Sequence, residues 1–215
     1  RDQPTAGKMQ AICLFQLAHD TVTSYTTGVP YCMVEMIEQK CGNWVRTGAT
    51  RQYETIQRFG GDFQKNIKDL HQHYSFMLMP SASFQDEDKY AAAALASILG
   101  GGDGSLLHWA LVDSGLAEAA AASADTSDQF GEQLVWAVCD PKNAEEVRDI
   151  IHRELTLLVS SLTQEDLSKV IAKASTGAAV ASERPAGRMQ RLGSMITTSG
   201  NYLSLEDELQ AIESL

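Results

Sequence analysis

The order of strand-like and helix-like segments is the feature of this sequence that most constrains its fold. Short apolar or alternating segments at 11–17, 71–79, 116–124 and 133–139 predict strands, since such runs suit a buried or half-buried extended chain. Helical periodicity predicts helices at 30–41, 90–99, 106–112 and in four segments after residue 143. The resulting order, β-α-β-α-α-β-β-α-α-α-α, predicts an α+β domain with an antiparallel-containing mixed sheet and helices packed mainly on one face.

Local chemistry marks several of the helix ends. Asn143 is expected to start the first of the four late helices, Thr163 and Ser204 to cap the second and the last, and Pro185 to open the third. The glycine-rich run 100–104 follows a helix and does not join a strand to a helix. It therefore predicts a helix end and a tight turn, with a phosphate cradle as the less favoured alternative.

Composition limits the classes of protein and of partner. A chain of 215 residues that is 44% apolar can bury a sizeable core, and we expect residues 1–215 to form a single α+β domain in which 43–66 is a long connection. Residues 81–215 carry 21 Asp and Glu against 9 Lys and Arg. This acidity argues against nucleic acid as a partner. It would tolerate basic peptides, although simple solubility explains it as well.

Two further features concern the surroundings of the chain. No uncharged apolar run approaches the roughly 20 residues that span a bilayer, so no membrane span is expected. Four scattered cysteines do not make a disulfide framework, which favours a soluble, cytoplasmic protein. Because the chain begins with Arg1, we expect it to be a piece of a longer protein.

No set of residues in the sequence forms a convincing catalytic centre. HExxH, HxxEH and CxxC are all absent. His71 and His73 would share one face of a predicted strand and could hold a metal, but a third ligand is missing nearby and a polar strand face is the alternative. Ser75, Ser105 and Cys139 are possible nucleophiles without an identifiable base, and Cys139 suits a buried strand better. We therefore assign no catalytic and no metal-binding residue.

Several segments, taken in order, resemble the pitrilysin/insulinase zinc metallopeptidases. The segment 90–102, which ends in Leu-Gly-Gly-Gly, and the following segment 106–117 resemble the LGGG region of that family. Further similar segments cover nearly the whole chain: 11–17, 34–44, 162–167, 183–193 and 202–209. The resemblance implies an α+β domain of about this size, of which two or four close as a clamshell around an unfolded peptide. One domain of the family carries an inverted HxxEH zinc motif whose Glu is the general base.

The chain departs from the family pattern at the positions that carry chemistry. It lacks HxxEH, and where the family has an Arg and a Tyr that help to bind the substrate carbonyl it has Leu111 or Val112, and Glu118. An apolar side chain cannot stabilise an oxyanion and a carboxylate would oppose one. The resemblance thus implies a C-terminal, non-catalytic type of domain that is inactive alone, with no cofactor of its own and zinc in a partner domain. It suggests these contacts to a peptide: Gly101, Gly102, His108 and Glu118.

Three functions remain open at this point. The first is the substrate-chamber, peptide-binding half of a pitrilysin-like zinc metalloendopeptidase. Its partners would be a zinc-bearing N-terminal half or subunit and an unfolded peptide, which would bind as an added strand at a sheet edge. The second is a structural or assembly subunit derived from such a peptidase, like the core proteins of respiratory complexes, which would bind a partner but no peptide. The third is an independent hydrolase that uses His71 and His73.

Overall fold

The computed structural model describes residues 30–44, 60–200 and 202–215. The chain divides into two compact units, one made of residues 1–53 and 176–209 and the other of residues 54–175 and 210–215. The strand predicted at 11–17 and most of the predicted connection lie outside the described residues. The described end of that connection, 60–66, is irregular and exposed, and exposed chain without helix or strand continues to residue 71.

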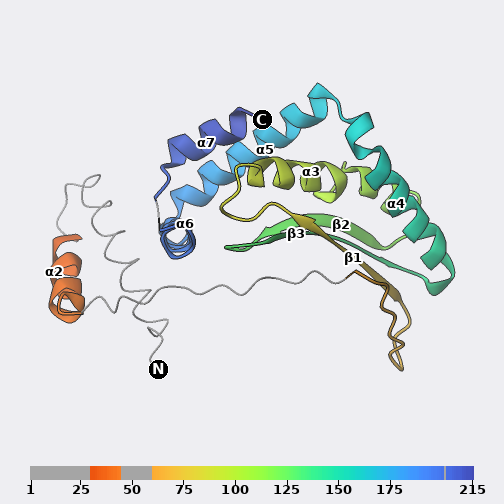
Figure 1. Cartoon of the computed structure of the whole chain (residues 1–215), viewed down its shortest axis with the longest axis horizontal. Helices are drawn as coiled ribbons and strands as arrows, with labels where there is room; N and C mark the ends of the chain where they lie inside the picture. Colours follow the sequence, from red (N-terminus) through yellow and green to blue (C-terminus); the bar gives the residue numbers. More distant parts are fainter. Residues whose placement is uncertain (1–29, 45–59, 201) are drawn as a thin grey trace. The chain divides into compact units, whose positions relative to one another are not determined.

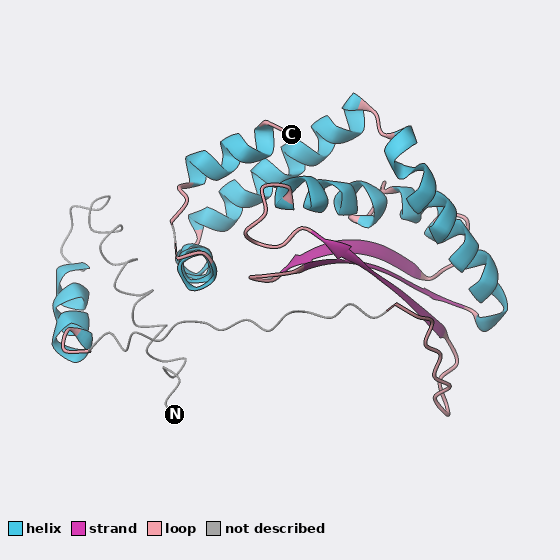
Figure 2. Cartoon of the chain, viewed as in Figure 1, coloured by secondary structure: helices cyan, strands magenta, loops and turns pink. Residues whose placement is uncertain are grey.

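The strands described in the second unit form a three-stranded antiparallel sheet, which is its framework. Its strands are β1 (His73–Ser81), β2 (Ala119–Thr126) and β3 (Gly131–Cys139), and β3 lies in the middle in the order β1-β3-β2. The register pairs Phe76 with Trp136, and Trp136 with Ala121 on the other side. Helix α3 (Lys89–Gly100) and helix α4 (Ala144–Ser161) pack on one face of this sheet (Figures 1 and 2). The predicted α+β class, with an antiparallel sheet covered by helices, is confirmed.

The core of this unit lies between the sheet and its helices. Every second residue of β3 points into it, so that Val135, Ala137 and Cys139 are buried. Helix α3 can approach β2 closely because it ends in a glycine: a Cβ atom on Gly100 would lie 2.3 Å from the backbone nitrogen of Ala122. The members of the core share full or nearly full burial: Ile98, Leu99, Leu107, Leu111, Ala117, Val135, Ala137, Cys139, Val147, Ile151 and Leu158.

The bounds of β1 and β2 differ from the prediction for identifiable reasons. Strand β1 begins at His73 and continues through Pro80, which pairs with Glu132. Proline is tolerated there because β1 lies at the edge of the described sheet, and edge strands can accommodate a residue without an N–H. Strand β2 begins later than predicted because the N–H groups of Leu116 and Ala117 donate to the carbonyl of Leu111, 3.0 and 2.9 Å away, and close the preceding turn.

That turn follows η1 (His108–Val112), a π-helix where an ordinary short helix was expected. The start of α4 also differs from the predicted capping arrangement. The short 3-10 turn η2 (Pro141–Asn143) precedes it, and the carboxylate of Asp140 accepts the N–H of Lys142 at 3.0 Å. Asn143 makes no capping bond: its backbone is already helical, with φ −94° and ψ −3°, because η2 continues directly into α4. Its side-chain Nδ2 donates to the carbonyl of Leu116 at 3.1 Å and so ties η2 to the turn before β2.

The remaining helices begin where the sequence predicts. Helix α5 (Gln164–Glu183) is preceded by Thr163, whose Oγ1 accepts the N–H of Asp166 at 3.2 Å. Helix α6 (Pro185–Thr198) starts with its proline, and α7 (Leu205–Glu213) is preceded by Ser204, whose Oγ accepts the N–H of Asp207 at 3.0 Å. Helix α2 (Pro30–Cys41) also has the predicted bounds.

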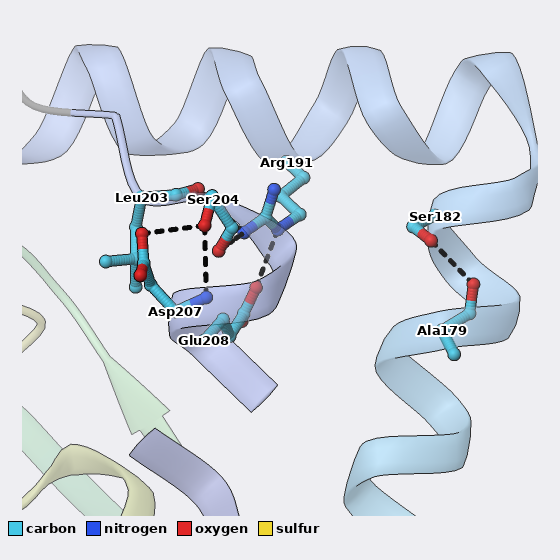
Figure 3. Close-up of polar contacts among 7 residues, drawn as sticks. All are labelled: Ala179, Ser182, Arg191, Leu203, Ser204, Asp207 and Glu208. Carbon is cyan, nitrogen blue, oxygen red and sulfur yellow. Dashed lines mark hydrogen bonds and ion pairs between the residues drawn. The ribbon is translucent and has the colours of Figure 1, made fainter. Parts of the chain in front are cut away.

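A single arginine connects α6 with the start of α7 in the first unit (Figure 3). The guanidinium of Arg191 donates to Oε2 of Glu208 at 2.6 Å and to the carbonyls of Leu203 and Ser204 at 2.8 and 3.0 Å. Both charged side chains are only 20% exposed. This contact therefore fixes the corner between the two helices by charge-assisted hydrogen bonds in a partly desolvated place.

Candidate functional site

The sheet face that α3 and α4 leave uncovered is the most distinctive surface of the second unit. Cross-strand pairing arranges its side chains in four rows, each with one residue from β1, β3 and β2. The three apolar rows are Tyr74, Val138 and Ala119; Phe76, Trp136 and Ala121; and Leu78, Leu134 and Ser123. The fourth, the acidic row, is Pro80, Glu132 and Asp125. We call this surface the open face.

Large apolar side chains on the open face are exposed to an unusual degree. Phe76 is 61% and Leu78 is 63% exposed, and the neighbouring Tyr74 is 44% exposed. On the central strand, Leu134 and Trp136 are half-buried between their neighbours. Contiguous exposed apolar surface of this kind marks interaction sites in soluble proteins. The alternation of β1 was visible in the sequence, but the sequence did not show that its bulkier apolar set points away from the helices.

The two carboxylates of the acidic row face each other directly. Asp125 and Glu132 are cross-strand partners, and like charges in this position destabilise a sheet. Neither takes part in any ion pair of the described residues. Asp125 has a marginal contact of 3.5 Å with the hydroxyl of Ser123 in the next row. The turn end of the open face is therefore negative and unneutralised.

Glu118 lies at the opposite end of the sheet, just before β2. Its N–H donates to the carbonyl of Val138 at 2.8 Å, and its carboxylate accepts the side-chain amide of Gln72. The hydroxyl of Tyr74 donates to the other side-chain atom of that amide, Oε1 of Gln72, at 3.0 Å. The carboxylate is thus directed toward β1, and its predicted role toward a peptide stays a prediction.

The other three predicted contacts, Gly101, Gly102 and His108, surround the turn after α3. The carbonyl of Gly101 accepts Nζ of Lys173 at 2.7 Å, which ties the turn to α5. Gly102 has a φ of 110°, a conformation that other residues rarely adopt. Nδ1 of His108 lies 3.8 Å from the carboxylate of Asp103, which is fully exposed. These contacts stabilise the turn that ends α3. The contact of Gly101, Gly102 and His108 with a peptide stays a prediction.

His71 and His73, the possible metal-binding pair, do not lie on one strand as predicted. Strand β1 begins at His73, so that His71 lies before the strand and the expected common strand face is not formed. The described part of the chain holds no group of three or more His, Cys, Asp or Glu side chains that could bind a metal ion.

The positions where the resemblance places catalytic side chains are equally informative. Leu111 is fully buried in the core, and so a side chain at this position does not reach the open face. Cys139 is also fully buried, as predicted. Burial raises the pKa of its thiol, and the carboxylates of Asp140 and Glu118 raise it further. A neutral, buried thiol is a poor nucleophile.

Comparisons with known proteins agree with this architecture. The family model described as the peptidase M16 inactive domain matches residues 32–174. The chain therefore belongs to the M16 inactive-domain family, which confirms the resemblance to pitrilysin-type peptidases and places the chain among non-catalytic domains. No curated protein matches the sequence significantly.

Solved structures share the fold at low sequence identity. Complex III2 from Candida albicans contains a chain that matches with a TM-score of 0.74 and 13% identity, over 85% of this chain and 46% of that one. A peptidase M16 inactive domain from Pseudomonas fluorescens matches with a TM-score of 0.57 and 19% identity, over 67% and 35% of the two chains. The inactive peptidase domain of a putative zinc protease from Bordetella parapertussis matches with a TM-score of 0.54 and 19% identity, over 75% and 90%. The chain thus spans less than half the length of the first two.

Among the described helices, none is long and apolar enough to cross a bilayer.

Proposed function

We propose that this chain supplies a peptide-binding wall in the substrate chamber of a pitrilysin-like zinc metalloendopeptidase. Residues 1–215 would serve as one non-catalytic half of a clamshell, and a separate half or subunit would supply the zinc and the general base. Family membership and the coverage of less than half of longer relatives support this arrangement. The observation that carries the proposal is the exposed apolar surface of the open face.

The chemistry of the open face suits an unfolded peptide. Side chains such as Phe76 and Leu78 can take up apolar groups of any sequence, because burial of apolar area is non-directional. Among the strands that the structure describes, β1 is in addition at the edge of the sheet, and an edge strand can pair with the backbone of an extended peptide irrespective of its sequence. The wall would bind and align a peptide while the zinc-bearing half cleaves it.

Two leucines of similar exposure allow a matched test. Leu78 lies on the open face and is 63% exposed, while Leu157 lies on α4 and is 47% exposed. Peptide hydrolysis is measured for the zinc-bearing half alone, and after addition of the chain as wild type, Leu78→Ala or Leu157→Ala. We expect the wild type and Leu157→Ala to raise kcat/KM equally and Leu78→Ala to raise it less, mainly through a higher KM. No gain from the wild type, or an equal gain from both variants, would refute the role of the open face.

The similarity to a chain of a respiratory assembly supports a second candidate, a structural subunit. In that case the open face would be covered by a partner protein and would bind no peptide. Calorimetric titration of the chain with unfolded peptides separates the two functions, because only the peptide-binding wall gives saturable heat that Leu78→Ala reduces.

A further inference from the structure

Residues 60–71, which we call the arm, are an exposed segment directly before β1. The arm contains neither helix nor strand, and Figure 2 shows it as a loop that extends beyond the start of β1. Phe63 is 92% and Ile67 is 58% exposed, although apolar side chains of this size are normally buried. Among the described residues, the arm makes one backbone hydrogen bond, which is 3.4 Å long and joins the N–H of Leu70 to the carbonyl of Ile67. Few contacts therefore hold the arm in this open conformation.

The side chains of the arm alternate as in a strand with one apolar side. Because successive side chains of an extended chain point in opposite directions, one side of the arm would carry Phe63, Lys65 and Ile67. The other side would carry the polar residues at 64, 66 and 68. Lys65 suits the apolar side, since its long aliphatic stem can lie along apolar neighbours while its ammonium group stays in water. The arm thus has a pattern that matches the open face of β1.

The connection between the arm and β1 has the features of a hairpin loop. Residues 69–72 separate position 68 from the first residue of β1, and loops of this length are common in hairpins. Asp69 has a φ of 67°, in the left-handed region that tight reversals use. Gln72 is hydrogen-bonded to Tyr74 and to Glu118, so the start of β1 is held in place. Residues 69–71 can therefore act as the hinge of the arm.

We propose that residues 61–68 fold back on β1 as an added antiparallel strand, and that the arm in this way closes the sheet edge to other chains. A loop of residues 69–72 sets the register, and the side chains of paired residues share one face. Three pairs then lie on the open face: Ile67 with Tyr74, Lys65 with Phe76, and Phe63 with Leu78. The two apolar side chains of the added strand thus meet exposed apolar side chains of β1.

Closure of the arm relieves two unfavourable features at once. Apolar pairs across neighbouring strands, such as Ile67 with Tyr74, stabilise a sheet and remove apolar area from water. The outer N–H and C=O groups of β1, at the edge of the described sheet, gain partners, and an uncovered edge invites association with other chains.

The closed arm also acts as an intramolecular inhibitor, a consequence that rests on the proposed function. An unfolded peptide that adds to β1 must first displace residues 61–68. Because the arm is joined to β1 by a short loop, it competes at a high effective concentration. The open conformation leaves the edge available, and the closed one occupies it.

Disulfide trapping tests the closed arrangement in the 215-residue chain. Phe63→Cys with Leu78→Cys places two thiols opposite each other in the proposed register, where the Cβ atoms lie about 5 Å apart. Gln64→Cys with Leu78→Cys is the matched control, because position 64 points to the other face of the sheet. After mild oxidation, mass spectrometry of the digested chain identifies the bonded pair. We expect positions 63 and 78 to be bonded, and the bond between positions 64 and 78 to be largely absent.

A binding measurement tests the inhibition. Anisotropy follows the binding of a short fluorescein-labelled peptide of alternating serine and valine. Phe63→Ser with Ile67→Ser removes the apolar side chains that close the arm, and Gln64→Ser with Asn66→Ser changes the opposite side as the control. All four positions are exposed, so the core stays intact. The first pair of substitutions should tighten binding roughly fivefold, as for an edge that is open in about one molecule in five, and the control pair should leave binding unchanged.

The outcomes separate this inference from the proposed function. Equal trapping of both cysteine pairs, or of neither, would overturn the closed arrangement, since the edge would then be open or have another occupant. A disulfide between two chains would assign the arm to a second copy and overturn the self-inhibition. Trapping within one chain without a change of peptide affinity in the Phe63→Ser, Ile67→Ser variant would overturn it as well. A peptide that binds neither the wild type nor any variant would contradict the proposed function, while the disulfide result would still decide the place of the arm.

Discussion

Substitution of Gly100 by alanine tests the packing that supports the open face from behind. Gly100 is the last residue of α3 and contacts the backbone of β2, the strand that carries Asp125. A Cβ atom at this position would lie 2.3 Å from the nitrogen of Ala122, 2.7 Å from the carbonyl carbon of Ala121 and 2.9 Å from the Cβ of Ala122. Ordinary contacts of a Cβ atom begin near 3.4 Å. The nearest two of these atoms belong to the backbone and cannot rotate away. The clash is therefore relieved only if the end of α3 and strand β2 separate by about an ångström.

The expected loss of stability follows from two opposing terms. Overpacking of a tight interior costs typically 1–3 kcal/mol, whereas replacing a helical glycine by alanine contributes roughly 0.5–1 kcal/mol in favour of folding. We therefore expect Gly100→Ala to lower the free energy of unfolding by about 1–2 kcal/mol, which corresponds to a fall in Tm of roughly 2–8 °C for a chain of this size. Urea unfolding is followed by the fluorescence of Trp136 in the Trp44→Phe, Trp109→Phe background, so that the signal comes from the sheet.

The control is the same substitution in open space. A Cβ atom on Gly177, within α5, would meet no atom within 4 Å, and Gly177→Ala should stabilise the chain slightly. If Gly100→Ala were as stable as the wild type, or gained stability as Gly177→Ala does, the close approach of α3 to β2 would be wrong. The rigid placement of the open face would then lose its support.

Two further predictions concern the helices. Arg191→Lys keeps the charge but loses the planar guanidinium that donates to Glu208 and to the two carbonyls before α7. Amide hydrogen exchange in α7 should therefore accelerate. The control is Lys173→Arg, which changes a single exposed contact and should leave the exchange rate in α7 unchanged. An unchanged exchange rate in α7 would contradict the role of Arg191. Two hydrogen bonds hold the pKa of Asp166 below its ordinary value: the larger effect comes from the hydroxyl of Thr163 and the smaller from its N–H. The ionised carboxylate therefore stabilises the fold at neutral pH, and this contribution is lost as the pH falls through the pKa of Asp166 in the folded chain. Thr163→Ala should therefore flatten the acid dependence of Tm between about pH 5 and 3, and an unchanged pH profile would refute this linkage.

Local signals in the sequence were sufficient for most helices and for the fold class. Pro185, Thr163 and Ser204 mark helix starts correctly because proline geometry and hydroxyl capping depend only on neighbouring residues. Asn143 does not cap α4, because the turn η2 before the helix gives it a helical backbone; its Nδ2 instead donates to the carbonyl of Leu116, 27 residues away in the chain. Capping chemistry predicts a donor or an acceptor, and only the fold decides which group it meets.

The candidate site shows the same division. The sequence determined that residues 71–79 alternate and that the chain lacks HxxEH, and its segments indicated the family. It could not determine which side of the alternating strand meets the helices, because both sets contain apolar residues. That choice depends on the pairing of β1 with β3, which places Met77 and Met79 on the core side and Phe76 and Leu78 on the open face. The same pairing brings Asp125 opposite Glu132, since a hairpin register joins residues that have no periodic relation in the sequence.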